Sequence, residues 1–298
     1  MDKYFKINVS KYSQDKHFFV YYPASLSKPH DNSVMFVMEK YISNAKSLLL
    51  VKNCLVFWPN RIEVPNEINK RHLVIKSSEP RKDYNRFFRD NHIINHPENN
   101  KFDIINGAYI CKGCKIGAGC TIMPDVYIGK DVVIGNNVYI GCGAKLVGRI
   151  SIGNNVVIRE NAVIGADGLS TDRDNDGSSL TMPQFGGVLI GDNVLIGANT
   201  VIARGAIDDT IIMNGSKIDN CCFISHNVII EENVFIVGET IMMGSSSALK
   251  NSYISGNVTI RNKITINQGA FVGMGAVVTK NVDSGTIVMG NPARKKGD

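Results

Sequence analysis

The stretch IGKDVVIGNNVYIGCGAKL, residues 128–146, decides the fold of this 298-residue chain. An aliphatic residue recurs at every sixth position of the stretch, at Ile128, Ile134, Ile140 and Leu146. Neither an α-helix nor an ordinary strand has this period, because their side-chain patterns repeat at about 3.6 and 2 residues. The sequence is therefore built from short repeats.

The six-residue ladder runs through most of the chain. It occupies 25 positions, from Ile110 to Ile164, from Ile190 to Ile202 and from Ile212 to Val278. Repeats of this length are typical of a parallel β-helix, in which the aliphatic side chain fills the interior and small residues permit the corners. Three units close one coil, so the ladder predicts about eight coils and, at ~4.8 Å per coil, a prism roughly 40 Å long. Each coil buries its aliphatic layer only by stacking on its neighbours.

Two interruptions of the ladder indicate where a site lies. A polar, Gly-rich segment, residues 165–187, has to loop out of the prism. A smaller bulge of four extra residues lies around 204–209. Long loops on a rigid scaffold usually line a site, and both interruptions fall near the coil that carries His226. We therefore expect the functional residues there.

An acidic run inside the loop has one feature of a calcium site. Residues 172–177, DRDNDG, match the first half of an EF-hand loop. Pro183 stands where that loop requires a bidentate Glu. We therefore expect a solvated acidic turn.

The first hundred residues lack the six-residue period. Apolar stretches alternate with polar turns there, which favours a small α/β domain over residues 1–100. The aromatic residues of segment 81–88 are spaced to suit one face of an amphipathic helix. The boundary is expected within residues 95–101, which are rich in turn formers, followed by the β-helix over 101–298. The fold class is mainly β.

Composition narrows the function. Lys and Arg exceed Asp and Glu by 33 to 27 without a long basic run, which favours small anionic ligands over nucleic acid. The seven cysteines are an odd number in a chain that starts without a signal peptide, so reduced thiols are expected. No apolar run is long enough to span a bilayer. We expect a cytoplasmic protein with no stable membrane insertion.

Of six histidines, only His226 lies in the repeat region. A β-helix metalloenzyme such as a γ-type carbonic anhydrase needs several histidines around zinc, so no metal is expected. A single imidazole can still act as a general base near neutral pH. The simpler alternative is a corner histidine without a role.

Several motifs of the chain occur together in one known family. They are residues 161–168, 182–186, 190–210, 217–220 and 224–228. In these motifs, and over about residues 95–280, the chain resembles the lipid A pathway N-acyltransferases that act on UDP-3-O-acyl-glucosamine. The resemblance implies a left-handed β-helix that assembles as a homotrimer. It also implies acyl transfer to the amine of a nucleotide-linked amino sugar, for lipopolysaccharide or surface polysaccharide synthesis.

The resemblance assigns roles to particular residues. It implies that His226 is the general base and that Asp219, seven positions earlier, orients it. Gly244 follows His226 by one coil, which places its N–H about one strand spacing away, where it can stabilise an oxyanion. Asn227 and Asp208 are expected substrate contacts.

Two further parts of the acceptor site resemble that family less closely. Lys263 is expected to touch the acceptor, although it replaces a second histidine of that family. The family stacks the uracil end of the acceptor on aromatic side chains, and Phe36 and Tyr41 are the nearest candidates here.

The C-terminus departs from the lipid A enzymes. It is similar to the Gly-Asn-Pro-Ala ending of sugar acetyltransferases that use acetyl-CoA, so acetyl-CoA is the expected cosubstrate and coenzyme A the expected partner. The expected contacts to it are Gly273, Gly275, Arg294, Lys295 and Lys296, the last three as partners of the CoA phosphates. Two alternatives stay open: an acyl-ACP-dependent lipid A enzyme, and a non-catalytic β-helix scaffold.

Overall fold

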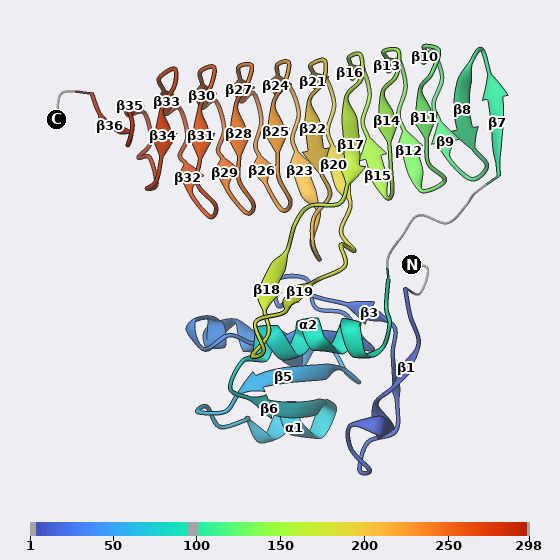
Figure 1. Cartoon of the computed structure of the whole chain (residues 1–298), viewed down its shortest axis with the longest axis vertical. Coiled ribbons are helices and arrows are strands. Elements are labelled where there is room, and N and C mark those ends of the chain that lie inside the picture. The colour runs from blue at the N-terminus through green and yellow to red at the C-terminus, as the bar shows by residue number, and fades with distance from the viewer. Residues whose placement is uncertain (1–3, 95–100, 297–298) are drawn as a thin grey trace. The chain divides into compact units, whose positions relative to one another are not determined.

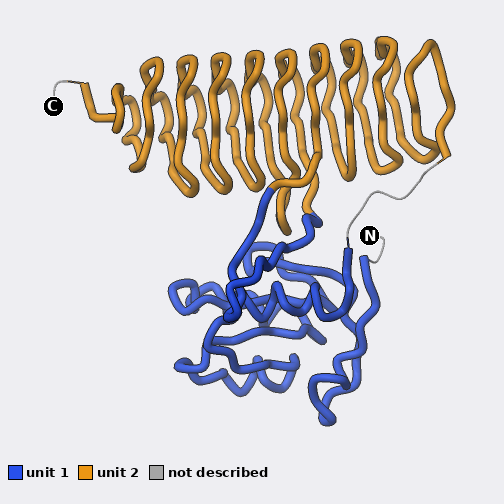
Figure 2. The backbone as a smooth tube through the Cα atoms, in the orientation of Figure 1, with its two compact units in different colours: residues 1–96, 169–185 blue, residues 97–168, 186–298 orange. Residues whose placement is uncertain are grey.

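The computed structural model describes residues 4–94 and 101–296. Contacts divide the chain into two compact units, shown in separate colours in Figure 2 and treated separately below. Unit 1 comprises residues 1–96 and 169–185, and unit 2 comprises residues 97–168 and 186–298. The boundary predicted within 95–101 lies mostly outside the described residues. Within the described ranges, no helix is long and apolar enough to cross a membrane.

Unit 2 is a parallel β-helix, as the ladder predicts, with the coils stacked side by side in Figure 1. Three sheets form its faces. Face 1 contains β10 (Thr121–Ile122), β13 (Tyr139–Ile140), β16 (Val157–Ile158), β21 (Leu195–Ile196), β24 (Lys217–Ile218), β27 (Phe235–Ile236), β30 (Tyr253–Ile254), β33 (Phe271–Val272) and β35 (Ile287–Met289). The short β36 (Arg294–Lys295) pairs antiparallel with β35 and ends this sheet.

Face 2 continues each coil. It contains β8 (Ala108–Cys111), β11 (Tyr127–Ile128), β14 (Lys145–Leu146), β17 (Val163–Ala166), β22 (Val201–Ala203), β25 (Phe223–Ile224), β28 (Ile241–Met242), β31 (Thr259–Ile260) and β34 (Val277–Val278). The antiparallel strand β7 (Phe102–Ile105) covers its first edge.

Face 3 closes the coil. It contains β9 (Lys115–Ile116), β12 (Val132–Ile134), β15 (Ile150–Ile152), β20 (Val188–Ile190), β23 (Thr210–Ile212), β26 (Ile229–Ile230), β29 (Ser247–Ala248) and β32 (Thr265–Ile266). The turns between consecutive faces form three edges of the prism, which we name edge 1–2, edge 2–3 and edge 3–1.

The ladder residues form the core of unit 2. Ile224 pairs with Met242 in the next coil, and both side chains are fully buried. Strands of consecutive coils keep this register along each face because the inward aliphatic residues stack in columns. At the N-terminal end Ile116 is 37% exposed, since β9 is the terminal strand of its sheet.

Unit 1 is a small α/β unit. Its parallel sheet has the order β3 (Tyr22–Pro23), β4 (Ser33–Phe36), β5 (Leu55–Pro59) and β6 (Leu73–Ser77). Its other elements are β1 (Ile7–Asn8), η1 (Val9–Lys11), β2 (Phe19–Val20), η2 (Glu39–Leu50), α1 (Asn66–Arg71) and α2 (Pro80–Asp90). The helix expected over 81–88 is confirmed as α2, whose Tyr84, Phe87 and Phe88 are buried.

The extruded loop differs from its expected form. Residues 169–185 belong by their contacts to unit 1, where β18 (Thr171–Arg173) and β19 (Ser179–Thr181) form an antiparallel hairpin. The prediction of a solvated acidic turn is wrong for Asp174, whose side chain is only 11% exposed and accepts hydrogen bonds from Arg86 and Arg89 of α2. Among the described residues, no three His, Cys, Asp or Glu side chains gather as metal ligands would.

Acid should release this hairpin from α2. The hydrogen bonds from Arg86, and then those from Asn175 N–H and Arg89, hold the pKa of Asp174 well below its ordinary value. A depressed pKa stabilises the folded state above that ordinary value, near 3.8, and the contribution is lost as the pH falls toward the folded pKa. We expect unchanged hydrogen-exchange protection of the hairpin from neutral pH down to about pH 5, and a decline below about pH 4.

In the Asp174→Asn variant, the hairpin should already have weaker hydrogen-exchange protection than in the wild-type protein at neutral pH. Asp176→Asn is the matched control, because Asp176 accepts hydrogen bonds from Ser178 at the hairpin turn and pairs with no arginine in the described structure. Equal protection in both variants would exclude this role of Asp174.

Candidate functional site

Five of the predicted site residues of unit 2, among them His226, lie on edge 2–3. His226 lies in the turn between β25 and β26, and Gly244 lies in the corresponding turn one coil later. Lys263 follows in the next turn along the same edge and is exposed. Both ladder interruptions, 165–187 and 204–209, leave the prism at this edge as well. The sequence expectation that the interruptions accompany His226 agrees with this geometry.

The His226 imidazole is held between two glycines. A Cβ at Gly168, at the root of the extruded loop, would lie 2.8 Å from His226 Cβ and 3.1 Å from its Cδ2. A Cβ at Gly244 would lie 2.6 Å from His226 Nε2 and 2.7 Å from Cε1. These distances are shorter than van der Waals contact, so the ring fits only because both neighbours lack a side chain. The ring is half-buried, which leaves it accessible to a substrate.

Gly244 presents a free backbone donor beside the imidazole. Gly238 holds the same place in its own six-residue unit, and its N–H donates to Asp219 Oδ2 at 3.2 Å. The N–H of Gly244 has no hydrogen-bond partner within the described part of the chain, although the residue is buried. A buried donor without a partner is costly unless a ligand completes it. The arrangement suits an oxyanion that forms next to His226 Nε2.

Asn227 ties His226 to the bulge. Its side-chain oxygen accepts from Ala206 N–H at 3.0 Å and lies 3.1 Å from His226 Nδ1. Its side-chain nitrogen donates to the Asp208 carbonyl at 2.8 Å. Asn227 was expected to contact substrate, but these bonds occupy its amide within the chain. The bulge therefore supports the histidine directly, which the sequence alone did not indicate.

Both ends of the extruded loop are fastened to the bulge. The Arg204 guanidinium is buried, and its Nε donates to Asp167 Oδ1 at 2.6 Å, immediately before Gly168. At the other end, Asp209 Oδ1 accepts from Gly187 N–H at 2.7 Å and pairs with Arg149. Arg204 and Gly168 were missed by sequence reasoning. The one signal for them was that both stand in the motifs that carry the family resemblance.

Removing the Arg204 guanidinium should loosen this edge. We expect Arg204→Met to lower the free energy of unfolding of unit 2 by about 2 kcal/mol, because charge-assisted hydrogen bonds contribute on this order. Denaturant unfolding followed by circular dichroism measures the loss. Arg149→Met is a matched control, since Arg149 is 40% exposed and should matter less. An equal loss in both variants would show that burial of Arg204 is not the cause.

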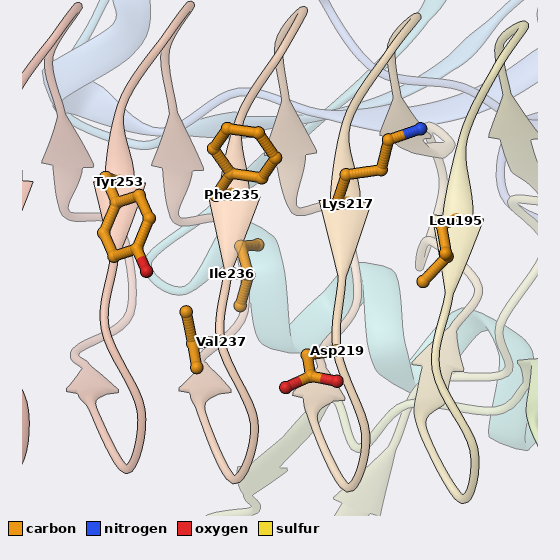
Figure 3. Close-up of a pocket in the computed structure, with 7 residues that line it drawn as sticks. All are labelled: Leu195, Lys217, Asp219, Phe235, Ile236, Val237 and Tyr253. Atoms are coloured by element: carbon orange, nitrogen blue, oxygen red, sulfur yellow. The ribbon is translucent and has the colours of Figure 1, made fainter.

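Asp219 does not meet His226 within one chain. It is an exposed residue on edge 1–2, between β24 and β25, whereas His226 lies at the far end of face 2. Asp219 lines a pocket of about 240 Å³ on face 1. Figure 3 shows it there with Lys217, Phe235 and Tyr253. The expected contact between Asp219 and the imidazole is thus absent from the single chain, and Asn227 occupies His226 Nδ1 instead.

The residues expected to hold the cosubstrate also lie away from His226. Gly273 and Gly275 are on edge 1–2, between β33 and β34. Arg294, Lys295 and Lys296 are exposed at or beside β36, and none forms a salt bridge in the described structure. Unpaired cations of this kind are available to phosphate groups.

The two candidates for base stacking lie in unit 1. Phe36 ends β4 and packs against Tyr84, with ring centroids 4.9 Å apart. Tyr41 is 46% exposed, and Lys40 Nζ lies 4.7 Å from its ring centroid. Tyr41 is therefore the more exposed of the two rings, whereas Phe36 is partly used in packing.

Comparison with known proteins agrees with the fold. Residues 107–141 and 131–166 match the family model described as bacterial transferase hexapeptide (six repeats). A UDP-N-acetylglucosamine acyltransferase from Bacteroides fragilis superposes with a TM-score of 0.59 at 28% identity, over 65% of this chain and 74% of that one. The enzyme of that name from Campylobacter jejuni gives 0.58 at 22% identity, over 65% and 74%. The chain therefore has a left-handed parallel β-helix fold built from hexapeptide repeats, the fold of these solved acyltransferases.

More specific sequence similarity is local. The UDP-3-O-acylglucosamine N-acyltransferase of Francisella tularensis subsp. holarctica is 50% identical over 62 residues, which are 21% of this chain and 18% of that protein. The enzyme of the same name from Coxiella burnetii is 46% identical over 63 residues, again 21% and 18%. The matched segment thus spans less than a fifth of these relatives.

Proposed function

We propose that the protein is an N-acyltransferase that moves an acyl group from a thioester to the amine of a nucleotide-linked amino sugar. The observation that carries the proposal is that His226 Nε2 lies against Gly244, whose N–H has no partner among the described residues. Acyl transfer needs these two groups together: a base for the attacking amine and a donor for the oxyanion.

The geometry supports the following steps. The sugar amine attacks the thioester carbonyl as His226 Nε2 takes its proton, and the carbonyl electrons move onto oxygen. The Gly244 N–H donates to that oxyanion, which is worth about 3 kcal/mol where such donors have been removed in other enzymes. The carbonyl then re-forms, the C–S bond breaks, and the imidazolium returns the proton to the leaving thiolate.

Acetyl-CoA is the proposed donor. The exposed Arg294, Lys295 and Lys296 supply three cations without acidic partners in the described structure, which suits the phosphates of coenzyme A. A Cβ at Gly275 would meet nothing within 4 Å, so this residue leaves space for the thioester arm along edge 1–2, and the backbone of Gly273 is a proposed contact beside it. In unit 1, Tyr41 is the proposed stacking surface for the nucleotide base, with Phe36 beside Tyr84 as the second. Lys263 and Asp208 are proposed acceptor contacts.

The local identity to UDP-3-O-acylglucosamine N-acyltransferases favours a second candidate. In that case the acceptor is UDP-3-O-acyl-glucosamine, and the donor is the acyl-ACP implied by the family resemblance. Lys263 argues against it, because a cation replaces the family's second histidine in the acceptor site. The two candidates share the chemistry at His226 and differ in both substrates.

One assay panel separates these candidates. Acetyl-CoA and a long-chain acyl-ACP are each offered with UDP-, dTDP- and GDP-linked amino sugars, and thiol release is followed. The proposal predicts release with acetyl-CoA and at least one amino sugar. Release with acyl-ACP alone selects the lipid A reaction. If neither thioester binds and no thiol is released, both enzyme candidates are contradicted, and the non-catalytic β-helix scaffold is the alternative that remains.

Assembly as a homotrimer is part of the proposal. Exposed apolar side chains on face 1 (Phe235, Tyr253, Phe271) and on face 2 (Phe223, Ile241) supply surfaces on which copies can pack. Asp219 and the basic C-terminus can serve one thioester together with His226 only across neighbouring copies. Co-assembled His226→Ala and Asp219→Ala chains should therefore recover part of the activity that each variant lacks alone. Activity no greater than the sum of the separate variants would exclude a shared site.

A further inference from the structure

We infer that Asn227 is a positioning residue that fixes the tautomer of His226, with the proton on Nδ1 and the lone pair on Nε2. The inference gives the proposed base its reactive form and rests on the proposed function for its catalytic meaning. Four contacts of Asn227 at edge 2–3 support this assignment of the tautomer. No sequence feature indicated it, because the contacts involve the bulge that interrupts the ladder.

The orientation of the Asn227 amide follows from its two backbone neighbours. One end faces the Ala206 N–H at 3.0 Å, which can only donate, so that end must be the oxygen. The other end faces the Asp208 carbonyl at 2.8 Å, which can only accept, so that end must be the nitrogen. A flipped amide would set donor against donor and acceptor against acceptor. The oxygen is therefore the atom that lies 3.1 Å from His226 Nδ1.

The amide orientation decides the protonation of the ring. An amide oxygen accepts only, so a hydrogen bond at this distance requires His226 Nδ1 to carry the proton. The neutral ring then has its lone pair on Nε2, on the side of Gly244, where a Cβ would lie within 2.6 Å. The lone pair of the base thus lies beside Gly244, whose N–H has no partner among the described residues and is proposed for the oxyanion.

The bulge holds Asn227 in place from the backbone side as well. Asn227 N–H donates to the buried Thr210 Oγ1 at 2.9 Å. Asn227 has a φ of 58°, a left-handed conformation that Asn tolerates better than most residues. A Cβ at Gly205 would lie 1.6 Å from the Asp208 carbonyl oxygen, so Gly205 is needed for that carbonyl to reach its position. The bulge and Asn227 therefore position the His226 ring jointly.

The test reads the tautomer directly, without activity. Protein labelled with 15N in its histidine rings is studied by NMR in alkaline buffer, and the His226 signals are assigned by their loss in His226→Ala. Protonated and unprotonated ring nitrogens have well-separated shifts, and we expect a protonated Nδ1 and an unprotonated Nε2. Asn227→Gly keeps the left-handed backbone and should leave a mixture of both tautomers. Asn227→Asp retains the acceptor and should keep Nδ1 protonated.

Asn257→Gly is the matched control, since Asn257 has a φ of 54° on a different edge and should leave the signals unchanged. In an acyl-transfer assay, Asn227→Gly should lower kcat by about tenfold or more with little change in KM, because a wrong tautomer costs up to about 10⁴ in serine proteases. A protonated Nε2 in the wild-type protein, or an unchanged tautomer in Asn227→Gly, would overturn the inference. The correct tautomer in a protein that transfers no acyl group would refute the proposed function alone.

Discussion

We expect His226→Ala to lower the rate of acyl transfer by about 10² to 10⁴, the range that a positioned general base contributes. The imidazole is the side chain that lies against Gly244, whose N–H has no partner among the described residues, so it is the group placed to take the proton of the amine. The fold should survive, because His226 is half-buried at a turn and not part of the aliphatic core. Steady-state kinetics and thermal melting measure the two effects separately.

His17→Ala provides the control for this prediction. His17 is an exposed histidine of unit 1 that lies near Ser10. It should leave both kcat and melting temperature close to those of the wild-type protein. Near-normal turnover in His226→Ala would show that another group accepts the proton, and the base assignment would then fail.

The second large effect is expected from one added methyl group. In Gly244→Ala, the new Cβ would lie 2.6 Å from His226 Nε2, so the imidazole has to move away from its bond to Asn227. A displacement of about 1 Å in a catalytic group can cost about 10²-fold in rate. Gly244 has no left-handed φ, so alanine meets no backbone strain there. We therefore expect a loss of about 10²-fold in kcat with little change in stability.

Gly256→Ala is the matched control for this steric effect. Gly256 holds the same place in its six-residue unit, and a Cβ there meets nothing closer than 3.4 Å. It should retain activity. Full activity in Gly244→Ala would mean that His226 Nε2 does not need to face that backbone, and it would contradict the proposed site.

The repeat made most of the fold predictable. Because the aliphatic positions recur every six residues, the sequence alone placed Ile224 and Met242 in one column of the core, where the structure pairs them. The same counting placed Gly244 one coil beyond His226. The same counting puts Asp219 and His226 in consecutive six-residue units, and therefore on different edges of one chain.

Contacts outside the ladder could not be read from the repeat. Arg86 reaches Asp174 across 88 residues of sequence, and no local pattern relates the two. Asn227 meets Ala206 through a bulge of extra residues, which breaks the register that makes the rest of the prism predictable. The contacts that position the candidate base thus lie where the six-residue repeat is interrupted.

Following the acyl group itself shows whether the protein transfers it to a sugar amine with the help of His226. The protein is incubated with acetyl-CoA carrying a 13C label in its acetyl group and with the nucleotide-linked amino sugars, and the products are fragmented by mass spectrometry. We predict that the label moves to the sugar nitrogen, and that this product falls by about 10² or more in His226→Ala. A label that reaches no sugar amine from either acetyl-CoA or an acyl-ACP, or one that transfers equally well without His226, would contradict the account.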